Sequence, residues 1–178
     1  MPTVITHSIV GLIAGKIMPV KNLPRRFWVL SLILPVLPDA DIISFYIGLP
    51  YENFWAHRGF FHSIPFAFIL ALTVMFLFFR REKYFSRRWN SLLIYFFVLT
   101  ASHGLFDALT NGGLGIALFS PFENSRYFFP FRPIEVSPIG VKAFFSLWGI
   151  RVILSEMLWF WLPGIILLLS MRVFRRRY

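Results

Sequence analysis

The chain has 178 residues, of which 57% are hydrophobic and 20% aromatic, with 23 phenylalanines and a net charge of +10. A water-soluble domain of this length rarely carries so much apolar material, so the composition favours an integral membrane protein. The chain has no cysteine, which excludes disulfide bonds and thiolate metal sites.

Five apolar segments follow one another, at residues 4–18, 27–47, 64–79, 92–109 and 152–171. Segments of roughly 20 apolar residues can cross the hydrocarbon core as helices, although the first segment is short. Segment 111–150 instead carries two adjacent glycines and prolines at 121, 130, 133 and 138, which interrupt helices. We therefore predict an all-α polytopic membrane helix bundle with about five transmembrane helices. It would form a single domain over residues 1–178, with segment 111–150 as an irregular outer cap.

The distribution of basic residues predicts the orientation of the bundle. Thirteen of the 18 lie in three patches, at residues 16–26, 80–88 and 172–177, and all three patches fall at the same set of helix ends. Such patches mark the cytoplasmic ends of membrane helices. The N-terminus is then outside and the C-terminus in the cytoplasm. Because topology explains the positive charge, we expect no nucleic-acid partner.

Polar side chains from all five segments are predicted to share one depth in the membrane. At a rise of about 1.5 Å per residue, they lie about 18–27 Å from the inner face. This layer contains His7, Asp39, Asp41, His62, His103, Asp107 and Glu156. Intramembrane charges are costly and usually face the bundle interior, so the layer predicts a common site in the outer third of the bilayer.

Histidine and carboxylate without cysteine form a ligand set typical of Zn²⁺, Mn²⁺ or Fe²⁺. His103 and Asp107 are four residues apart, so both point from one face of a helix. His57 and His62 are five apart and converge only if Gly59 allows a turn between them.

Asp39 and Asp41 are two residues apart and diverge on a regular helix, but Pro35 and Pro38 weaken the helix before them. We predict one or two divalent ions, with Zn²⁺ the first choice. The predicted ligands are His7, Asp39, Asp41, His57, His62, His103 and Asp107.

Four further residues are predicted to assist catalysis. Glu156, or one of the two aspartates near residue 40, would act as the general base. Arg58 would neutralise a phosphate or a developing oxyanion. Ser63 and Thr110 would orient the ligands.

Structural interpretations of the same residues stay open. His7 could form an interhelical hydrogen bond in a seam of small residues, and His103 could form a structural pair with Asp107. His57 and Arg58 could bind lipid phosphate. The two aspartates near residue 40 could cap a helix end in the headgroup region, and the acid at position 156 could pair with a basic residue.

An ordered motif series runs through the first two thirds of the chain: His7, LPDAD (37–41), HRGFFHS (57–63), HGLFDALTNGG (103–113) and PF (121–122). The series resembles that of the membrane-bound, predicted metal-dependent hydrolases of the YdjM type, the LexA-regulated group. This resemblance implies a prokaryotic inner-membrane protein with a metal site and a hydrolase activity.

The order of the motifs is also distantly similar to that of zinc-dependent phospholipase C and the P1-type nucleases, which cluster zinc ions with histidine and aspartate. Those enzymes use further histidines downstream, whereas this chain has none after His103. The departure argues against a three-metal cluster and for one or two ions.

The predicted function is a membrane-bound metal-dependent hydrolase with its site near the outer face, surrounded by membrane lipids. Its substrate would be a lipid or a lipid-linked phosphoester. One alternative is a non-catalytic metal-binding membrane protein with a structural or transport role. Transport is disfavoured because the inner halves of the predicted helices carry no acid or histidine. The other alternative is an amidase that resembles the membrane ceramidase-like enzymes.

Overall fold

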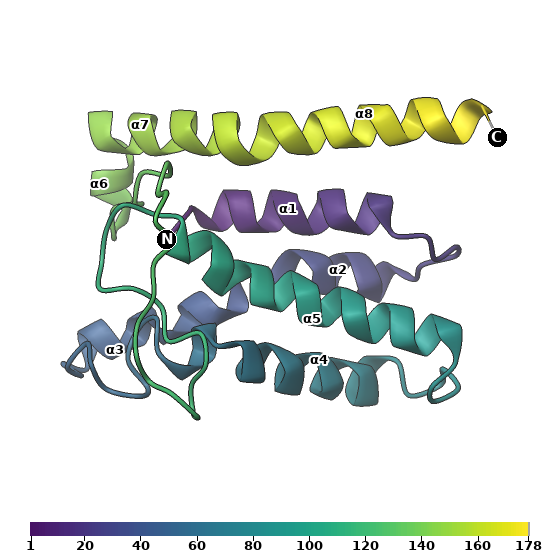
Figure 1. The fold of residues 1–178 in the computed structure, drawn as a ribbon, viewed down its shortest axis with the longest axis horizontal. Helices are drawn as coiled ribbons and strands as arrows, with labels where there is room; N and C mark the ends of the chain where they lie inside the picture. The colour runs from purple at the N-terminus through teal and green to yellow at the C-terminus, as the bar shows by residue number, and fades with distance from the viewer. Residues whose placement is uncertain (178) are drawn as a thin grey trace.

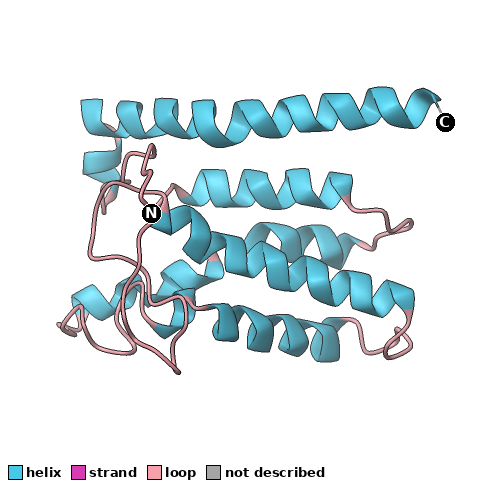
Figure 2. Ribbon diagram, in the orientation of Figure 1, coloured by secondary structure: helices cyan, strands magenta, loops and turns pink. Residues whose placement is uncertain are grey.

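The computed structural model describes residues 1–177 and is built of helices and loops (Figure 2). The α-helices are α1 (Val4–Ile17), α2 (Arg25–Ile33), α3 (Ile43–Tyr46), α4 (Ile64–Phe78), α5 (Arg87–Ala108), α6 (Val141–Phe144), α7 (Leu147–Glu156) and α8 (Leu162–Arg177). Two 3₁₀-helices, η1 (Leu37–Ile42) and η2 (Phe60–His62), and one π-helix, η3 (Met157–Trp161), complete the described elements. No strand occurs within residues 1–177, which confirms the predicted all-α class.

The longer helices run along the long axis of the molecule (Figure 1). α4 packs on α5, and α1 packs on α2, α5 and α8. Close approach of α1 and α2 depends on Gly11, where an added Cβ would lie 1.9 Å from the Ser31 carbonyl oxygen. Small residues allow helix backbones to approach in this way inside membranes.

The number of membrane spans differs from the prediction of five. α5 and the continuous helix Leu147–Phe174 are long and apolar enough to cross a membrane, and α2 with η1–α3, bent by 43°, would make a third span. α1 and α4 have 14 and 15 residues. They therefore rise only about 21 and 23 Å, less than the hydrocarbon thickness of about 30 Å. The structure thus supports two or three spans with two shorter apolar helices, and five spans are not confirmed.

The apolar core occupies the end of the bundle next to the basic loops. Phe27 from α2, Met75 from α4 and Phe96 from α5 are among its fully buried members. His103 and Asp107 lie two to three turns further along α5, beyond this core. The polar cluster is therefore at the opposite end of the bundle from the apolar core.

Residues 109–140 form no helix, as expected for the irregular segment. They fold back over the polar end of the bundle through backbone hydrogen bonds, including Ala117 N to Arg58 O (3.0 Å) and Ile64 N to Leu118 O (2.9 Å). The expected boundary at residue 150 is wrong, because α7 already begins at Leu147.

Candidate metal centre

Asp39 and Asp41 lie on η1, which follows the bend after α2. Both side chains are buried. A 3₁₀-helix has about three residues per turn, so positions two apart point in different directions. Asp39 Oδ1 lies 3.3 Å from His103 Nε2, whereas Asp41 Oδ1 lies 2.7 Å from His57 Nδ1. The two carboxylates diverge, as predicted, yet each faces a different histidine of one cluster.

The turn between His57 and His62 brings both rings to Asp41. Arg58 has φ +65°, which is uncommon for a residue with a side chain. An added Cβ on Gly59 would lie 2.4 Å from the Phe54 carbonyl oxygen, so only glycine fits this turn. His57 Nδ1 and His62 Nδ1 lie 2.7 and 3.0 Å from the Asp41 carboxylate oxygens. The predicted convergence of the two histidines is therefore present.

α5 supplies His103 and Asp107 from one face, and both are fully buried. His103 Nδ1 lies 2.7 Å from the carbonyl oxygen of Pro35, which can only accept. Nδ1 therefore carries a proton, and Nε2 is the ring nitrogen that faces the cluster. That Nε2 lies 3.0 Å from His62 Nε2.

His62 is oriented in the same way as His103. Its Nδ1 faces the Asp41 carboxylate, and its Nε2 faces His103 Nε2. Two ring nitrogens at 3.0 Å require a proton between them or a cation beside them, because two facing lone pairs would repel.

Two overlapping groups have ligand atoms within 4.8 Å of one another. The first is Asp39, His62, His103 and Asp107; the second is Asp39, Asp41, His57 and His62. All members are buried. These buried clusters can hold a metal ion.

The first group has unused ligand atoms. None of the four carboxylate oxygens of Asp39 and Asp107 receives a hydrogen bond from the described residues. Buried carboxylates are normally hydrogen-bonded, so such orphans need an explanation. The contacts from Asp39 Oδ1 to His62 and His103 Nε2 are 3.5 and 3.3 Å. A tetrahedral ion with bonds of about 2.1 Å has edges of about 3.4 Å. The residues therefore fit a divalent cation.

The balance of charged side chains at the site also favours a bound cation. Asp39, Asp41 and Asp107 carry three negative charges, and Arg58 is the basic side chain in ion-pair contact with them, with Nε 3.3 Å from Asp107 Oδ2. When only these side chains are counted and the histidines are neutral, the excess is two negative charges; a charged Met1 amino group, which also acts on Asp107, would reduce it. Burying an uncompensated charge costs several kcal/mol, whereas one dication balances this excess.

Asp41 contacts the Nδ1 atoms of His57 and His62 and does not belong to the first group. Its Oδ1 pairs with His57, and its Oδ2 contacts His62 and accepts a hydrogen bond from Arg58 N at 3.2 Å. Burial lowers the pKa of His57, which the bond to Asp41 only partly opposes. His57 is therefore a neutral imidazole at neutral pH, oriented by Asp41.

His7 lies beside the first group without belonging to it. Its ring stacks on His103 at a centroid distance of 4.1 Å, and its Nε2 is 3.6 Å from Asp107 Oδ1. Neither ring nitrogen has a hydrogen-bond partner among the described residues. His7 thus lies at the site, as predicted, and its ligand role stays a prediction.

Arg58 and Thr110 connect Asp107 to the irregular segment. Besides its contact with Asp107, Arg58 donates from Nη1 to Gly112 O (2.6 Å) and from Nη2 to Thr110 Oγ1 (3.1 Å). Thr110 Oγ1 donates in turn to Asp107 O (2.7 Å). The guanidinium therefore connects Asp107 to the irregular segment, and these two bonds use one hydrogen of each terminal nitrogen.

Glu156 and Ser63 have structural contacts. Glu156 accepts hydrogen bonds from Thr3 N, Thr3 Oγ1 and Thr6 Oγ1, and so closes the N-terminus of α1. It directly precedes the π-helix η3 and belongs to neither metal-binding group. Ser63 Oγ accepts from Phe66 N and caps α4 immediately after His62. Their predicted catalytic roles stay predictions.

Three residues have contacts at the site that were not predicted from the sequence. Pro35 orients His103, Ser44 Oγ accepts from His57 N at 3.0 Å, and Arg126 Nη1 donates to His57 O at 3.2 Å. The sequence distinguishes Arg126 from most basic residues, because it lies outside the three basic patches that explain the topology. The other two act through a backbone carbonyl and a common hydroxyl, which no spacing rule identifies.

Comparison with known proteins gives the family. The family described as YdjM inner membrane protein matches the whole chain, residues 1–178. The inner membrane protein YbcI of Escherichia coli (strain K12) is 39% identical over 177 residues, which cover 99% of this chain and 100% of that protein. No solved structure matches. The resemblance seen in the motif series is thereby confirmed, and the chain belongs to the YdjM family of inner membrane proteins.

Proposed function

We propose that this membrane protein is a metal-dependent hydrolase that acts on a lipid or lipid-linked phosphoester near the outer face of the inner membrane. The observation that carries the proposal is the buried group Asp39, His62, His103 and Asp107. Its carboxylate oxygens accept no hydrogen bond from the described residues, and its two imidazole Nε2 atoms face each other.

One ion in the first group is the favoured occupancy. The second group shares Asp39 and His62 with the first, so two ions would compete for these ligands. Asp41 and His57 are already paired with each other at 2.7 Å. Zn²⁺ suits a set of two imidazoles and two carboxylates, and Mn²⁺ or Fe²⁺ are the alternatives.

A divalent ion bound there supplies a Lewis acid and lowers the pKa of water to about 7. The remaining chemistry belongs to side chains beside the first group. A hollow of about 280 Å³ is lined by Tyr51, His57, Arg58, Gly113 and Trp148, among others. In this Arg58 hollow, the guanidinium would bind phosphate oxygens through its remaining N–H groups.

His57, held by Asp41, lines the Arg58 hollow and is placed to accept a proton from water. This assigns Asp41, one of the two predicted aspartates, to proton transfer through His57. Glu156 is the weaker candidate for the base, because its oxygens already accept three hydrogen bonds from α1.

A static structural metal is the main competing function. Four protein ligands fill a tetrahedral ion, as in structural sites, so a catalytic ion here would need a further position for water. The Arg58 hollow beside the first group favours catalysis. An amidase would use the same metal ligands. It would release an amine and a carboxylate, whereas a phosphoesterase would release phosphate or a phosphorylated headgroup.

The test uses purified protein in liposomes that contain phosphatidate or a lipid pyrophosphate. Phosphate release should require metal, stop with a chelator and return when Zn²⁺ is restored. Asp107→Asn should be inactive, whereas Glu123→Gln, at an exposed acid in the irregular segment, should match the wild type. Turnover that resists the chelator would refute the proposal. Firmly bound metal with no turnover of any phosphoester or amide would favour the structural role.

A further inference from the structure

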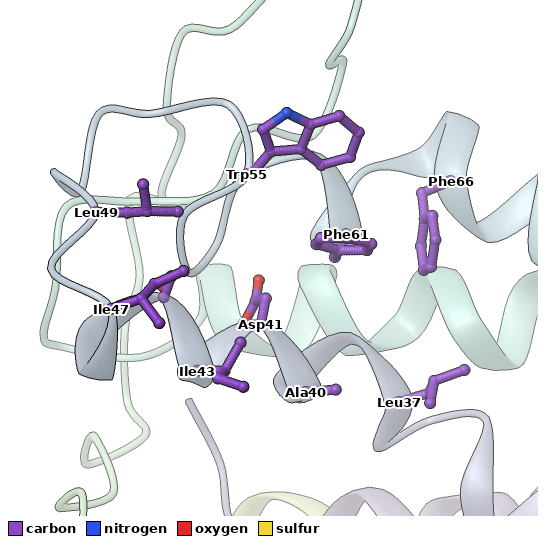
Figure 3. A pocket seen from close by; sticks show the side chains of 10 residues that line it. Leu37, Ala40, Asp41, Ile43, Ile47, Leu49, Trp55, Phe61 and Phe66 are labelled. Carbon is purple, nitrogen blue, oxygen red and sulfur yellow. The ribbon is translucent and has the colours of Figure 1, made fainter.

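A second, larger hollow lies on the other side of Asp41. It has a volume of about 470 Å³ and opens between η1, α3, η2 and the first turn of α4. Its lining includes Leu37, Ile43, Ile47, Trp55, Phe61 and Phe66 (Figure 3). We call it the apolar hollow.

The apolar hollow is in contact with the candidate metal centre through Asp41. Figure 3 shows the Asp41 carboxylate in the middle of the apolar side chains. The same carboxylate contacts His57 and His62 on its other side. A buried carboxylate is costly beside an apolar surface, and a packed core would normally fill this space. The apolar hollow therefore borders the candidate metal centre directly.

The walls of the apolar hollow are fixed and its mouth is exposed. The ring centroids of Trp55 and Phe61 are 5.7 Å apart, and those of Phe61 and Phe66 are 5.2 Å apart. Such aromatic contacts hold their rings in place. At the mouth, Ile43 is 61% and Ile47 66% exposed. If α2 with η1–α3 forms the third span, Ile43 would lie on its lipid-facing side.

The side chains that line the apolar hollow favour a hydrocarbon chain over a polar ligand. Apart from the indole of Trp55, its polar side chains are Asp41 and Ser44, and both are engaged, since Ser44 Oγ accepts from His57 N. A polar ligand or the backbone of a peptide would find few partners there. The volume lies in the range of about 300–1,000 Å³ that is typical of small-molecule sites.

The two hollows lie on either side of one pair of side chains. Asp41 lines the apolar hollow, and its partner His57 lines the Arg58 hollow. The hollow on the Asp41 side offers contacts to hydrocarbon, and the hollow on the His57 side offers the N–H donors of Arg58. This arrangement matches an amphiphile with a long apolar tail and a compact anionic head.

We propose that the apolar hollow binds one acyl chain of the substrate lipid while its phosphate lies at the Arg58 hollow. The inference rests on the proposed function and adds to it the position of the lipid tail. Ile43, Ile47, Trp55, Phe61 and Phe66 then determine which chains fit. Substrates with the same head and no long chain are poor ligands.

A photoreactive lipid tests this placement without requiring turnover. The probe is phosphatidate with a diazirine midway along one acyl chain, incorporated with the full-length protein in liposomes. After illumination, mass spectrometry should place most of the label within residues 37–66. Label spread evenly over exposed apolar positions such as Ile94 of α5 and Leu167 of α8 would overturn the inference.

Ile47→Trp places an indole in the apolar hollow and should reduce the label several-fold. The matched control is Ile69→Trp, at a 53% exposed position of α4 outside the hollow, which should keep the wild-type label. Equal labelling of the two variants would refute the site. Metal content and thermal stability show whether each variant is folded, and Ile43→Trp replaces Ile47→Trp if the latter does not insert.

A second copy of the chain is the other occupant that the test detects. Because the chain has no cysteine, Ile47→Cys introduces a single thiol. A rapid disulfide-linked dimer together with weak lipid labelling would show that another copy covers the hollow, and would overturn the inference. A protein that is labelled in the hollow but hydrolyses nothing would refute the proposed function alone.

Discussion

The role of Asp41 gives the sharpest test of how the candidate metal centre is built. The carboxylate contacts His57 Nδ1 at 2.7 Å and His62 Nδ1 at 3.0 Å. Asp41→Asn leaves one acceptor oxygen and introduces an NH₂ donor. The amide can therefore serve only one of the two rings, and the other ring loses its partner or changes tautomer.

The expected loss of metal affinity in Asp41→Asn follows from the contact between Asp41 and the ligating His62. Removing a carboxylate that orients a ligating histidine typically costs 10- to 100-fold in metal affinity. That range equals about 1.4–2.7 kcal/mol. Asp107→Asn should have a much larger effect, because it removes a ligand oxygen and also the charge that Arg58 Nε faces at 3.3 Å.

The assay is a zinc titration of purified protein against a fluorescent chelator, together with the metal content measured by mass spectrometry. Asp41→Asn should bind one ion with affinity weakened by about 10- to 100-fold, and Asp107→Asn should bind none. Glu82→Gln, which changes the ion pair with Arg88 in the loop at the far end of the bundle, is the control. If Asp41→Asn lost all metal, Asp41 would be a ligand; if it bound like the wild type, the orienting role would be wrong.

Three further predictions concern the other polar residues and the topology. Arg58→Lys should keep its metal but lose turnover, because an ammonium cannot bind a phosphate with two parallel donors; full activity would refute the phosphate-binding role. Glu156→Gln should lower the free energy of unfolding by about 1.5–3 kcal/mol, while the metal content stays unchanged; loss of metal would instead place Glu156 at the ion. In intact cells, Tyr84→Cys should resist an impermeant thiol reagent and Asn124→Cys should react; the opposite pattern would move the site to the cytoplasmic side.

Local geometry explains why much of the site was predictable. The spacing of His103 and Asp107 fixes their common face on α5 whatever surrounds the helix. The count of residues from the helix ends placed Asp39, Asp41 and His62 at the same depth, and the structure brings them together. These predictions needed only the rise of a helix and the cost of buried charge.

Side-chain direction and helix ends were less predictable. Glu156 has a similar predicted depth, yet it turns to the N-terminus of α1, because Thr3 and Thr6 present donors there. Depth does not specify direction around a helix. Hydropathy likewise suggested five spans because it counts apolar residues, whereas α1 and α4 end after 14 and 15 residues.

The central claim is that Asp39, His62, His103 and Asp107 hold one divalent ion. X-ray absorption spectroscopy of the zinc-loaded protein tests it most directly. The spectrum should show two imidazole ligands with their multiple scattering and oxygen ligands, at about 2.0–2.2 Å. His103→Ala should remove one imidazole contribution or all of the metal. A zinc shell without imidazole, or wild-type protein that takes up no metal, would contradict the account.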